Sequence, residues 1–180
     1  MYNLAKPLSA IALLAALFSN ASTALELTST DITEGHPMEK TFEYAGWGCS
    51  GKNQSPQLQW HDIPEGTKSF AITAYDPDAP TGSGFWHWIA LDLPAKTDHL
   101  VRGAKISELG GQEVRIDYGS VGFGGACPPV GDGMHRYQFT VWALPKASLG
   151  LDENTPPAVV GFTLNSLALD KATLTATYTR

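Results

Sequence analysis

The sequence is poor in charge and lacks a basic excess. Charged residues make up only 17% of its 180 residues, and 12 Lys plus Arg against 18 Asp plus Glu leave a formal net charge of −6 at pH 7. A general nucleic-acid binder, or a protein that docks on anionic membranes, needs a basic face, so this balance argues against both. Any anionic ligand must therefore be held by a local site, against the average field of the molecule.

Apolar runs long enough to span a bilayer are also missing. The most apolar stretch, 8–18 (LSAIALLAALF), is shorter than the roughly 20 residues that a membrane helix needs. Lys6 precedes this stretch and small residues follow it up to Ala24, which is the pattern of a cleaved secretory signal. We therefore expect removal of residues 1–24, leaving a single domain at 25–180 that is periplasmic or secreted, with no integral membrane association. The alternative is that 8–18 forms the first helix of the domain.

Cysteine is scarce, and its spacing excludes several kinds of site. Cys49 and Cys127 are the only two cysteines, and they form neither a C-x-x-C pair nor a zinc-type cluster. In an oxidising compartment we expect them to form one disulfide, the alternative being two separate buried thiols. A G-x-S-x-G nucleophile motif is absent as well, which argues against the common serine hydrolases.

What the sequence does contain is a series of short β-type segments separated by turn residues. Its 43% hydrophobic residues are ample for a packed core. Alternating or continuous apolar patterns predict strands at 69–75, 86–93, 135–144 and 173–179. A helix is expected at 156–168, where two prolines can open it and Ala158, Phe162, Leu164 and Leu167 lie near one face. The predicted fold class is mainly β, an antiparallel β-sandwich with one or two small helices near the C-terminus.

Three of these strands carry a polar residue at one end of an apolar face. Because residues two apart in a strand share a face, His135 is expected to project with Tyr137, and His87 with Ile89. Asp76 continues the apolar face of its own strand. Such an arrangement is typical of a site at the rim of a hydrophobic core, if the three strand ends meet.

The loops after these strands contain stiff segments. In 76–80 (DPDAP), each proline fixes its own φ at about −65° and restricts the residue before it. Asp76 is favoured as a site residue, whereas Asp78 is either a site residue or a turn residue that bonds its own backbone. The glycine-rich run 119–125 precedes Cys-Pro-Pro at 127–129, so backbone there can approach a ligand closely; an ordinary long loop is the alternative.

The polar residues at the strand ends offer several chemistries. A histidine can bind an anion when protonated, donate a hydrogen bond when neutral, or ligate a metal. A zinc site or a small hydrolase would use Asp76, His87 and His135, but their spacing matches no known metal motif. For each histidine, the alternative is a hydrogen-bonded core residue. We expect neither a metal nor another cofactor.

Together, several motifs resemble those of the phosphatidylethanolamine-binding protein family. They are 76–80 (DPDAP), 85–88 (FWHW) and 128–129 (PP) followed by 135–137 (HRY), with support from 49–56 (CSGKNQSP) before Trp60. The likeness covers essentially all of the chain after residue 24. It is strongest to the bacterial branch, the Raf-kinase-inhibitor-like proteins.

This resemblance implies a mostly antiparallel β-sandwich with a small anion-binding cavity at one end. Family positions that line the cavity fall on Asp76, His87, His135 and Tyr137, and those that form its walls fall on Pro80, Pro128 and Pro129. Members act mainly by binding phosphate-bearing head groups and similar anions, or as inhibitors of kinases or proteases. Eukaryotic members often have a glycine where Cys127 stands, so their loop behaviour does not transfer.

The sequence thus predicts a secreted or periplasmic binding or inhibitory module for a small phosphorylated or other anionic ligand, without turnover. A kinase-like or protease-like partner protein is left unidentified. The alternatives are a protease inhibitor that acts through its outer surface and, less favoured, a hydrolase using Asp76, His87 and His135. Affinity for the ligand is expected to rise from about pH 8 to about pH 6, as the histidines gain protons.

Overall fold

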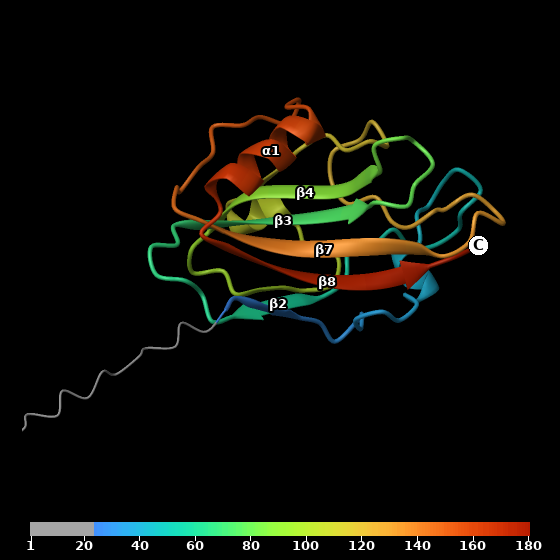
Figure 1. Cartoon of the computed structure of the whole chain (residues 1–180), viewed down its shortest axis with the longest axis horizontal. Coiled ribbons are helices and arrows are strands. Elements are labelled where there is room, and N and C mark those ends of the chain that lie inside the picture. Colours follow the sequence, from blue (N-terminus) through green and yellow to red (C-terminus); the bar gives the residue numbers. More distant parts are fainter. Residues whose placement is uncertain (1–23) are drawn as a thin grey trace, which may run out of the picture.

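Two antiparallel sheets face each other in the computed structural model, which describes residues 24–180 (Figure 1). The smaller sheet has the order β1-β2-β5, with β1 at Glu26–Thr28, β2 at Leu58–His61 and β5 at His99–Leu100. The larger sheet has the order β6-β4-β3-β7-β8, with β3 at Ser69–Asp76, β4 at Phe85–Pro94, β6 at Gln112–Glu113, β7 at His135–Leu144 and β8 at Asp170–Tyr178. The predicted mainly β sandwich is confirmed. The expected signal segment lies outside the described residues, apart from Ala24.

Large apolar side chains fill the space between the two sheets. Trp60 of β2 packs against Phe70 of β3, with ring centroids 5.4 Å apart, and both are fully buried. Trp88 and Phe139 of the larger sheet belong to the same core. Burying each such side chain stabilises the fold by about 1.5–3 kcal/mol. This core holds the central strands rigidly, and their ends carry the candidate site.

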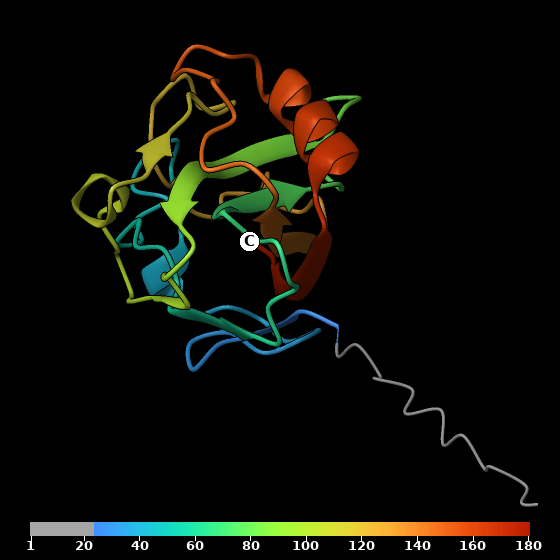
Figure 2. The same ribbon diagram turned by 90° about the vertical axis from the view of Figure 1, so that its left-hand side faces the viewer.

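The other face of the larger sheet is covered by one helix, α1 (Pro157–Leu167), which lies over β4 (Figures 1 and 2). A proline in the first turn suits a helix start, because the missing N–H would have no helical partner there. Val160 and Leu164 are buried, and Gly161 lets the Trp86 ring approach so closely that a Cβ would lie 3.0 Å from it. Within residues 24–180, no helix combines the length and the apolar character needed to cross a membrane.

The predicted apolar face of this helix is partly wrong. Leu164 is buried as expected, but Ala158 and Phe162 are exposed, the latter by 75%. The buried stripe runs through Val160 and Leu164, which are one turn apart at i and i+4. Ala158 and Phe162 form a second i, i+4 pair on the solvent side, so spacing alone did not decide which pair packs on the sheet.

Two 3₁₀ helices interrupt the long connections, η1 at Lys40–Phe42 and η2 at Ile106–Leu109. The segment after η1 forms a short parallel ladder with a distant loop. The Ala126 N–H donates to the Phe42 carbonyl at 3.1 Å, and the Tyr44 N–H donates to the Ala126 carbonyl at 3.0 Å. This ladder fixes the end of the glycine-rich run in place.

A β-bulge in β4 changes which of its residues share a face. The consecutive β3 residues Ala74 and Tyr75 pair with Trp88 and Trp86, so His87 has no partner in this ladder. Trp88 belongs to the core between the sheets, whereas Trp86 packs against the cluster beneath α1. The bulge leaves His87 free to turn toward the end of the sandwich.

Candidate ligand-binding cavity

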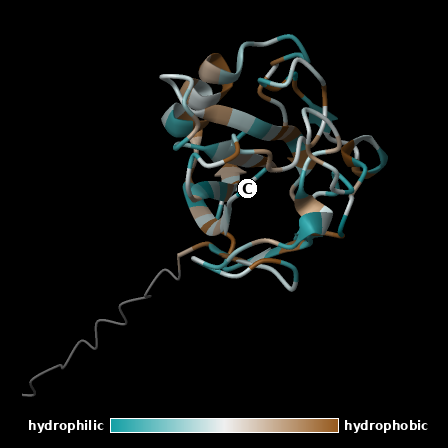
Figure 3. Cartoon of the chain, turned by 90° about the vertical axis from the view of Figure 1, so that its right-hand side faces the viewer, coloured by the Kyte–Doolittle hydropathy of each residue, from teal (hydrophilic) through white to brown (hydrophobic). Residues whose placement is uncertain are grey.

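Three strand ends converge on a cavity of about 180 Å³. Because β4 and β7 both pair antiparallel with β3, the last residue of β3 lies beside the first residues of the other two strands. Figure 3 looks onto this end of the molecule, at which β3 and β8 finish. The cavity is lined by Trp47, Asp76, Ala79, Pro80, Thr81, Phe85, His87, Tyr118, Cys127, Pro128, Pro129, His135 and Tyr137. The structure thus gathers every ligand-contacting residue predicted from the sequence, from Asp76 through Tyr137, around one space.

Asp76 and His135 form a buried pair on one wall. The Nδ1 of His135 lies 2.7 Å from a carboxylate oxygen of Asp76, and both side chains are almost completely buried. On its other side, Nε2 of His135 lies 3.2 Å from Asp132, so both ring nitrogens face carboxylates. Burial alone would lower the pKa of His135, but the hydrogen bonds and charges of Asp76 and Asp132 outweigh it and raise that pKa. This arrangement favours the form of His135 that carries a proton on each nitrogen.

His87 lies in a different environment within the same cavity. Its Nδ1 is 2.8 Å from the Gly124 carbonyl and 3.2 Å from the Gly125 carbonyl. Its ring lies edge-on to Tyr137, with the centroids 5.0 Å apart. Burial lowers the pKa of His87 to about 4, despite the nearby Asp76 carboxylate. The ring is therefore neutral at pH 7, with its hydrogen on Nδ1.

The prediction that His87 shares a face with Ile89 is wrong. Ile89 packs in the cluster beneath α1, whereas His87 lines the cavity with Asp76 and Tyr137. The physical reason is the bulge in β4, which inserts one residue and breaks the two-residue alternation.

Tyr137 contributes a buried phenol to the cavity lining. Its side chain is only 2% exposed, and its hydroxyl has no hydrogen-bond partner within residues 24–180. Burial raises the pKa of Tyr137, and the charge of Asp76 raises it further, so the hydroxyl keeps its hydrogen. An unsatisfied buried donor costs stability, which a ligand oxygen in the cavity would recover.

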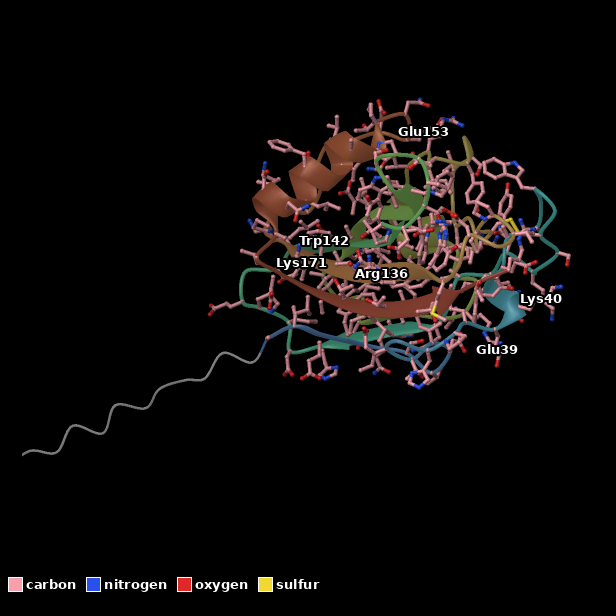
Figure 4. The ribbon with its side chains drawn as sticks, turned by 45° about the vertical axis from the view of Figure 1, so that its right-hand side comes forward. Glu39, Lys40, Arg136, Trp142, Glu153 and Lys171 are labelled. Carbon is pink, nitrogen blue, oxygen red and sulfur yellow. A yellow bond between two sulfur atoms is a disulfide. The ribbon has the colours of Figure 1, made fainter. Side chains whose placement is uncertain are left out.

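Prolines and a disulfide form the walls of the cavity. Pro80, Pro128 and Pro129 all line it. Cys127, next to them, is bonded to Cys49 across 78 residues, and the disulfide lies at this end of the molecule (Figure 4). The expected bridge is therefore present in the structure. It ties the Pro-Pro loop to the turn that carries Trp47.

Several residues around the cavity were not predicted from the sequence. Trp47, Phe85 and Tyr118 make an aromatic rim, in which the Tyr118 ring lies 4.7 Å from Trp47 and 4.8 Å from Phe85. Asp132 reaches His135 from the loop before β7. Phe85 belongs to the quoted FWHW motif and could have been included, but no pattern marks the other three, since they lie on irregular loops.

The two aspartates of the DPDAP turn, Asp76 and Asp78, make different contacts. Asp76 accepts a hydrogen bond from the Asp78 N–H at 2.8 Å, so the turn-type backbone contact belongs to Asp76. Asp78 instead holds Arg136, whose Nη2 lies 2.7 Å away, and this guanidinium lowers the pKa of the Asp78 carboxyl. Asp78 is thus a structural residue of the rim.

Backbone carbonyls of the glycine-rich run 119–125 accept hydrogen bonds from side chains that line the cavity. Those of Gly124 and Gly125 orient His87, and Tyr118 also donates to the Gly125 carbonyl at 3.0 Å. The zinc arrangement considered for Asp76, His87 and His135 does not fit these bonds, because Nδ1 of His87 and both nitrogens of His135 are already engaged.

The fold and the cavity define a class of protein: a β-sandwich of a ligand-binding type with a small cavity at one end. Comparison with known proteins identifies the family, because the phosphatidylethanolamine-binding protein model matches residues 28–179. The chain therefore belongs to the phosphatidylethanolamine-binding protein family.

Similar proteins agree with this assignment. YbcL of Escherichia coli (strain K12) is 45% identical over 167 residues, covering 89% of this chain and 91% of YbcL. Its crystal structure, described as a new member of the mammalian PEBP family, superposes with a TM-score of 0.84 over 88% of this chain and 99% of that one. YbhB of the same organism is 42% identical, over 86% of this chain and 99% of YbhB. A Mycobacterium tuberculosis relative named as a lipoprotein, LppC, is 32% identical over 78% of this chain and 63% of LppC.

Proposed function

We propose that this protein binds small phosphorylated or other anionic compounds in the cavity and does not turn them over. The observation that carries the proposal is the buried Tyr137 hydroxyl, which has no partner within residues 24–180 and faces the cavity beside the Asp76–His135 pair. A phosphoryl oxygen is an acceptor that such a donor can bind. The family name, which refers to phosphatidylethanolamine, supports a phosphorylated ligand.

The size of the cavity favours a head group over a whole lipid. A cavity of about 150 Å³ is enough for a benzene-sized molecule, so about 180 Å³ holds a phosphoryl group with a short substituent. The aromatic rim of Trp47, Phe85 and Tyr118 gives that substituent an apolar surface. Acyl chains would have to remain outside.

The hydroxyl groups that line the cavity are protonated, and this argues against hydrolysis by one of them as a nucleophile. Burial raises the pKa of Tyr118 and of Tyr137, with a further contribution from Asp76 in each case, so both phenols stay protonated and act as donors. Thr81 donates its hydroxyl hydrogen to the Gly84 carbonyl. None of these groups is paired with a free base, which nucleophilic catalysis would require.

We further propose that residues 1–24 are a cleaved secretory signal and that the mature protein is periplasmic or secreted. The Cys49–Cys127 disulfide supports an oxidising compartment, and the lipoprotein name of a relative agrees with an extracytoplasmic location.

A protein-binding role at the same end is a second candidate. Trp47, Val130 and Met134 are large apolar residues exposed by 60% or more; Trp47 lines the cavity, and the other two are sequence neighbours of the lining residues Pro129 and His135. Exposed apolar side chains clustered at a rim suit a protein partner, such as a protease. Tight protease binding that survives removal of the Tyr137 hydroxyl would favour this role.

The test of phosphoryl binding is calorimetric titration with phosphoethanolamine and with O-phosphotyrosine at about pH 6, using the oxidised protein and Tyr137→Phe. A hydrogen bond to a charged group is worth about 1.5–3 kcal/mol, so the variant should bind at least about tenfold more weakly. Its thermal stability should not fall, because the lost hydroxyl had no partner.

Tyr75→Phe is the matched control, since it removes a hydroxyl that donates to the Ser83 carbonyl outside the cavity. Affinity in this control should equal that of the unmodified protein. Absence of saturable binding to either compound, or equal affinity in Tyr137→Phe, would contradict the proposed function.

A further inference from the structure

The polar side chains that line the cavity leave very few hydrogen-bonding positions free. Asp76 accepts from the Asp78 N–H and from His135, whose second nitrogen faces Asp132. Thr81 and Tyr118 donate their hydroxyl hydrogens to backbone carbonyls. Among the buried lining side chains of residues 24–180, the hydroxyl of Tyr137 has no partner, and the hydrogen bonds of His87 are all made by Nδ1, which leaves its Nε2 free.

These two groups have opposite characters. The Tyr137 hydroxyl can donate a hydrogen. At His87, the carbonyls of Gly124 and Gly125 both face Nδ1, and a carbonyl only accepts, so Nδ1 must carry the ring hydrogen. Nε2 of the neutral ring is then a bare lone pair. The buried part of the cavity therefore offers one free donor, on Tyr137, and one free acceptor, on His87.

We propose, on the basis of the function proposed above, that the cavity takes up a phosphomonoester together with one proton, held between a phosphoryl oxygen and Nε2 of His87. Tyr137 donates to a second phosphoryl oxygen. Without the proton, an anionic oxygen would face the lone pair of Nε2, and the two would repel each other. The ligand class is thus a monoester that binds as its singly charged form, or as its doubly charged form plus a protonated His87; both contain the same number of protons.

The groups around His87 support the uptake of a single proton on binding. Asp76 from β3, His135 and Tyr137 from β7, and Tyr118 from the loop after β6 all line the cavity with it. The two carboxylate partners of His135 favour a ring that carries a proton on each nitrogen before the ligand binds, so its charge need not change on binding. Both phenols keep their hydrogens. A proton taken up on binding must then lie at His87 or on the ligand itself.

The experiment is calorimetric titration of the oxidised protein with methyl phosphate, in buffers that differ in ionisation enthalpy. A phosphomonoester has a second pKa of about 6, so at pH 7.5 most of it is doubly charged. About one proton per bound ligand should be taken up at pH 7.5, and close to none at pH 5, where the ligand already carries it. Dimethyl phosphate, a diester that cannot carry this proton, should bind at least about tenfold more weakly at pH 7.5.

Nitrogen-15 NMR of the histidine rings gives a second measurement that needs no variant. Free His87 should show a hydrogen on Nδ1 and none on Nε2, and the Nε2 signal should move toward the protonated form when methyl phosphate binds. His135, whose two nitrogens face carboxylates, is the internal reference, and its signals should not move when methyl phosphate binds. His99→Gln removes an exposed imidazole that does not line the cavity, and should leave proton uptake unchanged.

The outcomes separate this inference from the proposed function. Binding of methyl phosphate at pH 7.5 with no proton uptake and no change at Nε2 of His87 would overturn the inference and leave the phosphoryl-binding function intact. Equal affinity for dimethyl phosphate would likewise overturn it. No binding of methyl phosphate at either pH would remove the proposed function itself, and the inference with it.

Discussion

At the scale of single residues, two histidines in one cavity are held in opposite charge states. His135 lies between the carboxylates of Asp76 and Asp132, which favour the protonated ring. His87 is buried against backbone carbonyls, and burial favours the neutral ring. Both histidines are at most 4% exposed, so the difference comes from the carboxylates that hydrogen-bond to His135 and not to His87. Because the pKa of His87 is about 4, the expectation that it gains a proton between pH 8 and pH 6 does not describe this histidine in the free protein, whereas the rise in affinity toward pH 6 stays a prediction.

His87 should make the protein sensitive to acid. Because its pKa is about 4 in the folded state and about 6.5 when unfolded, its stabilising contribution is fully present above pH 6.5 and is lost as the pH falls toward 4. Between pH 7 and pH 4.5 the loss should amount to about 2 kcal/mol in the free energy of unfolding. Urea unfolding at pH 7 and pH 4.5 measures it.

In His87→Gln, which cannot titrate, this part of the pH dependence should disappear. His135 has the opposite sign: its raised pKa gives stability that is present below pH 6.5 and is lost as the pH rises through the folded value. An unchanged difference between pH 7 and pH 4.5 in His87→Gln would contradict the assignment.

At the scale of elements, loops rather than strands complete the cavity. The strands bring the polar residues to one end, but the 124–126 segment orients His87 and the Cys127 loop closes one wall. That segment is packed directly against the backbone after η1. A Cβ on Gly125 would lie 2.3 Å from the Phe42 carbonyl oxygen and 2.6 Å from the Tyr44 nitrogen. Only glycine lets these two loops pack so closely.

Gly125→Ala should therefore destabilise the protein by about 3 kcal/mol, the upper end of the usual overpacking range. It should also weaken ligand binding, because the carbonyls that hold His87 would shift. Gly131→Ala is a control for glycine replacement as such: it has a positive φ of 80° but open space around the added Cβ, so a cost of about 1–2 kcal/mol is expected. Chemical unfolding of both variants is the measurement. Equal losses would show that crowding at Gly125 is not the cause.

At the scale of the whole molecule, one covalent link constrains the chain. The Cys49–Cys127 bond closes a loop of 78 residues, which in the chain-entropy model stabilises the fold by about 4–5 kcal/mol. The first residue after the proposed cleavage point also fits the fold. Leu25 is 4% exposed, and its backbone nitrogen lies 2.9 Å from a carboxylate oxygen of Asp170. Cleavage after Ala24 would place a new positive charge beside that carboxylate.

Intact mass spectrometry of the protein recovered from an extracytoplasmic fraction tests both features. The mass should equal that of residues 25–180 less the two thiol hydrogens, and the denatured, unreduced protein should show no titratable thiol. A mass in that fraction that includes Met1 would contradict cleavage. Reactive thiols at Cys49 and Cys127 would contradict the bridge.

The fold class and most of the cavity lining can be predicted from the amino-acid sequence. Alternation and apolar runs placed β3, β4, β7 and β8, because strand patterns depend on local burial that side-chain spacing records. The motifs around Asp76, His87 and His135 carried the family, and with it the expectation that these residues gather. The pairing of Cys49 with Cys127 followed from their being the only two cysteines in a chain with a secretory pattern.

Tertiary structure alone decided the orientation and the charge of these groups. The bulge at His87 has no local signature, because it arises from the pairing of β4 with β3. The exposure of Phe162 is a second feature that the sequence does not reveal. The pairs Ala158/Phe162 and Val160/Leu164 have the same spacing, and only the packing of α1 on the sheet decides which pair is buried. The proton positions on His87 and His135 depend on carbonyls and carboxylates from other segments of the chain. Such partners are brought within hydrogen-bonding distance only by folding, so the chemistry of the cavity is a property of the folded protein.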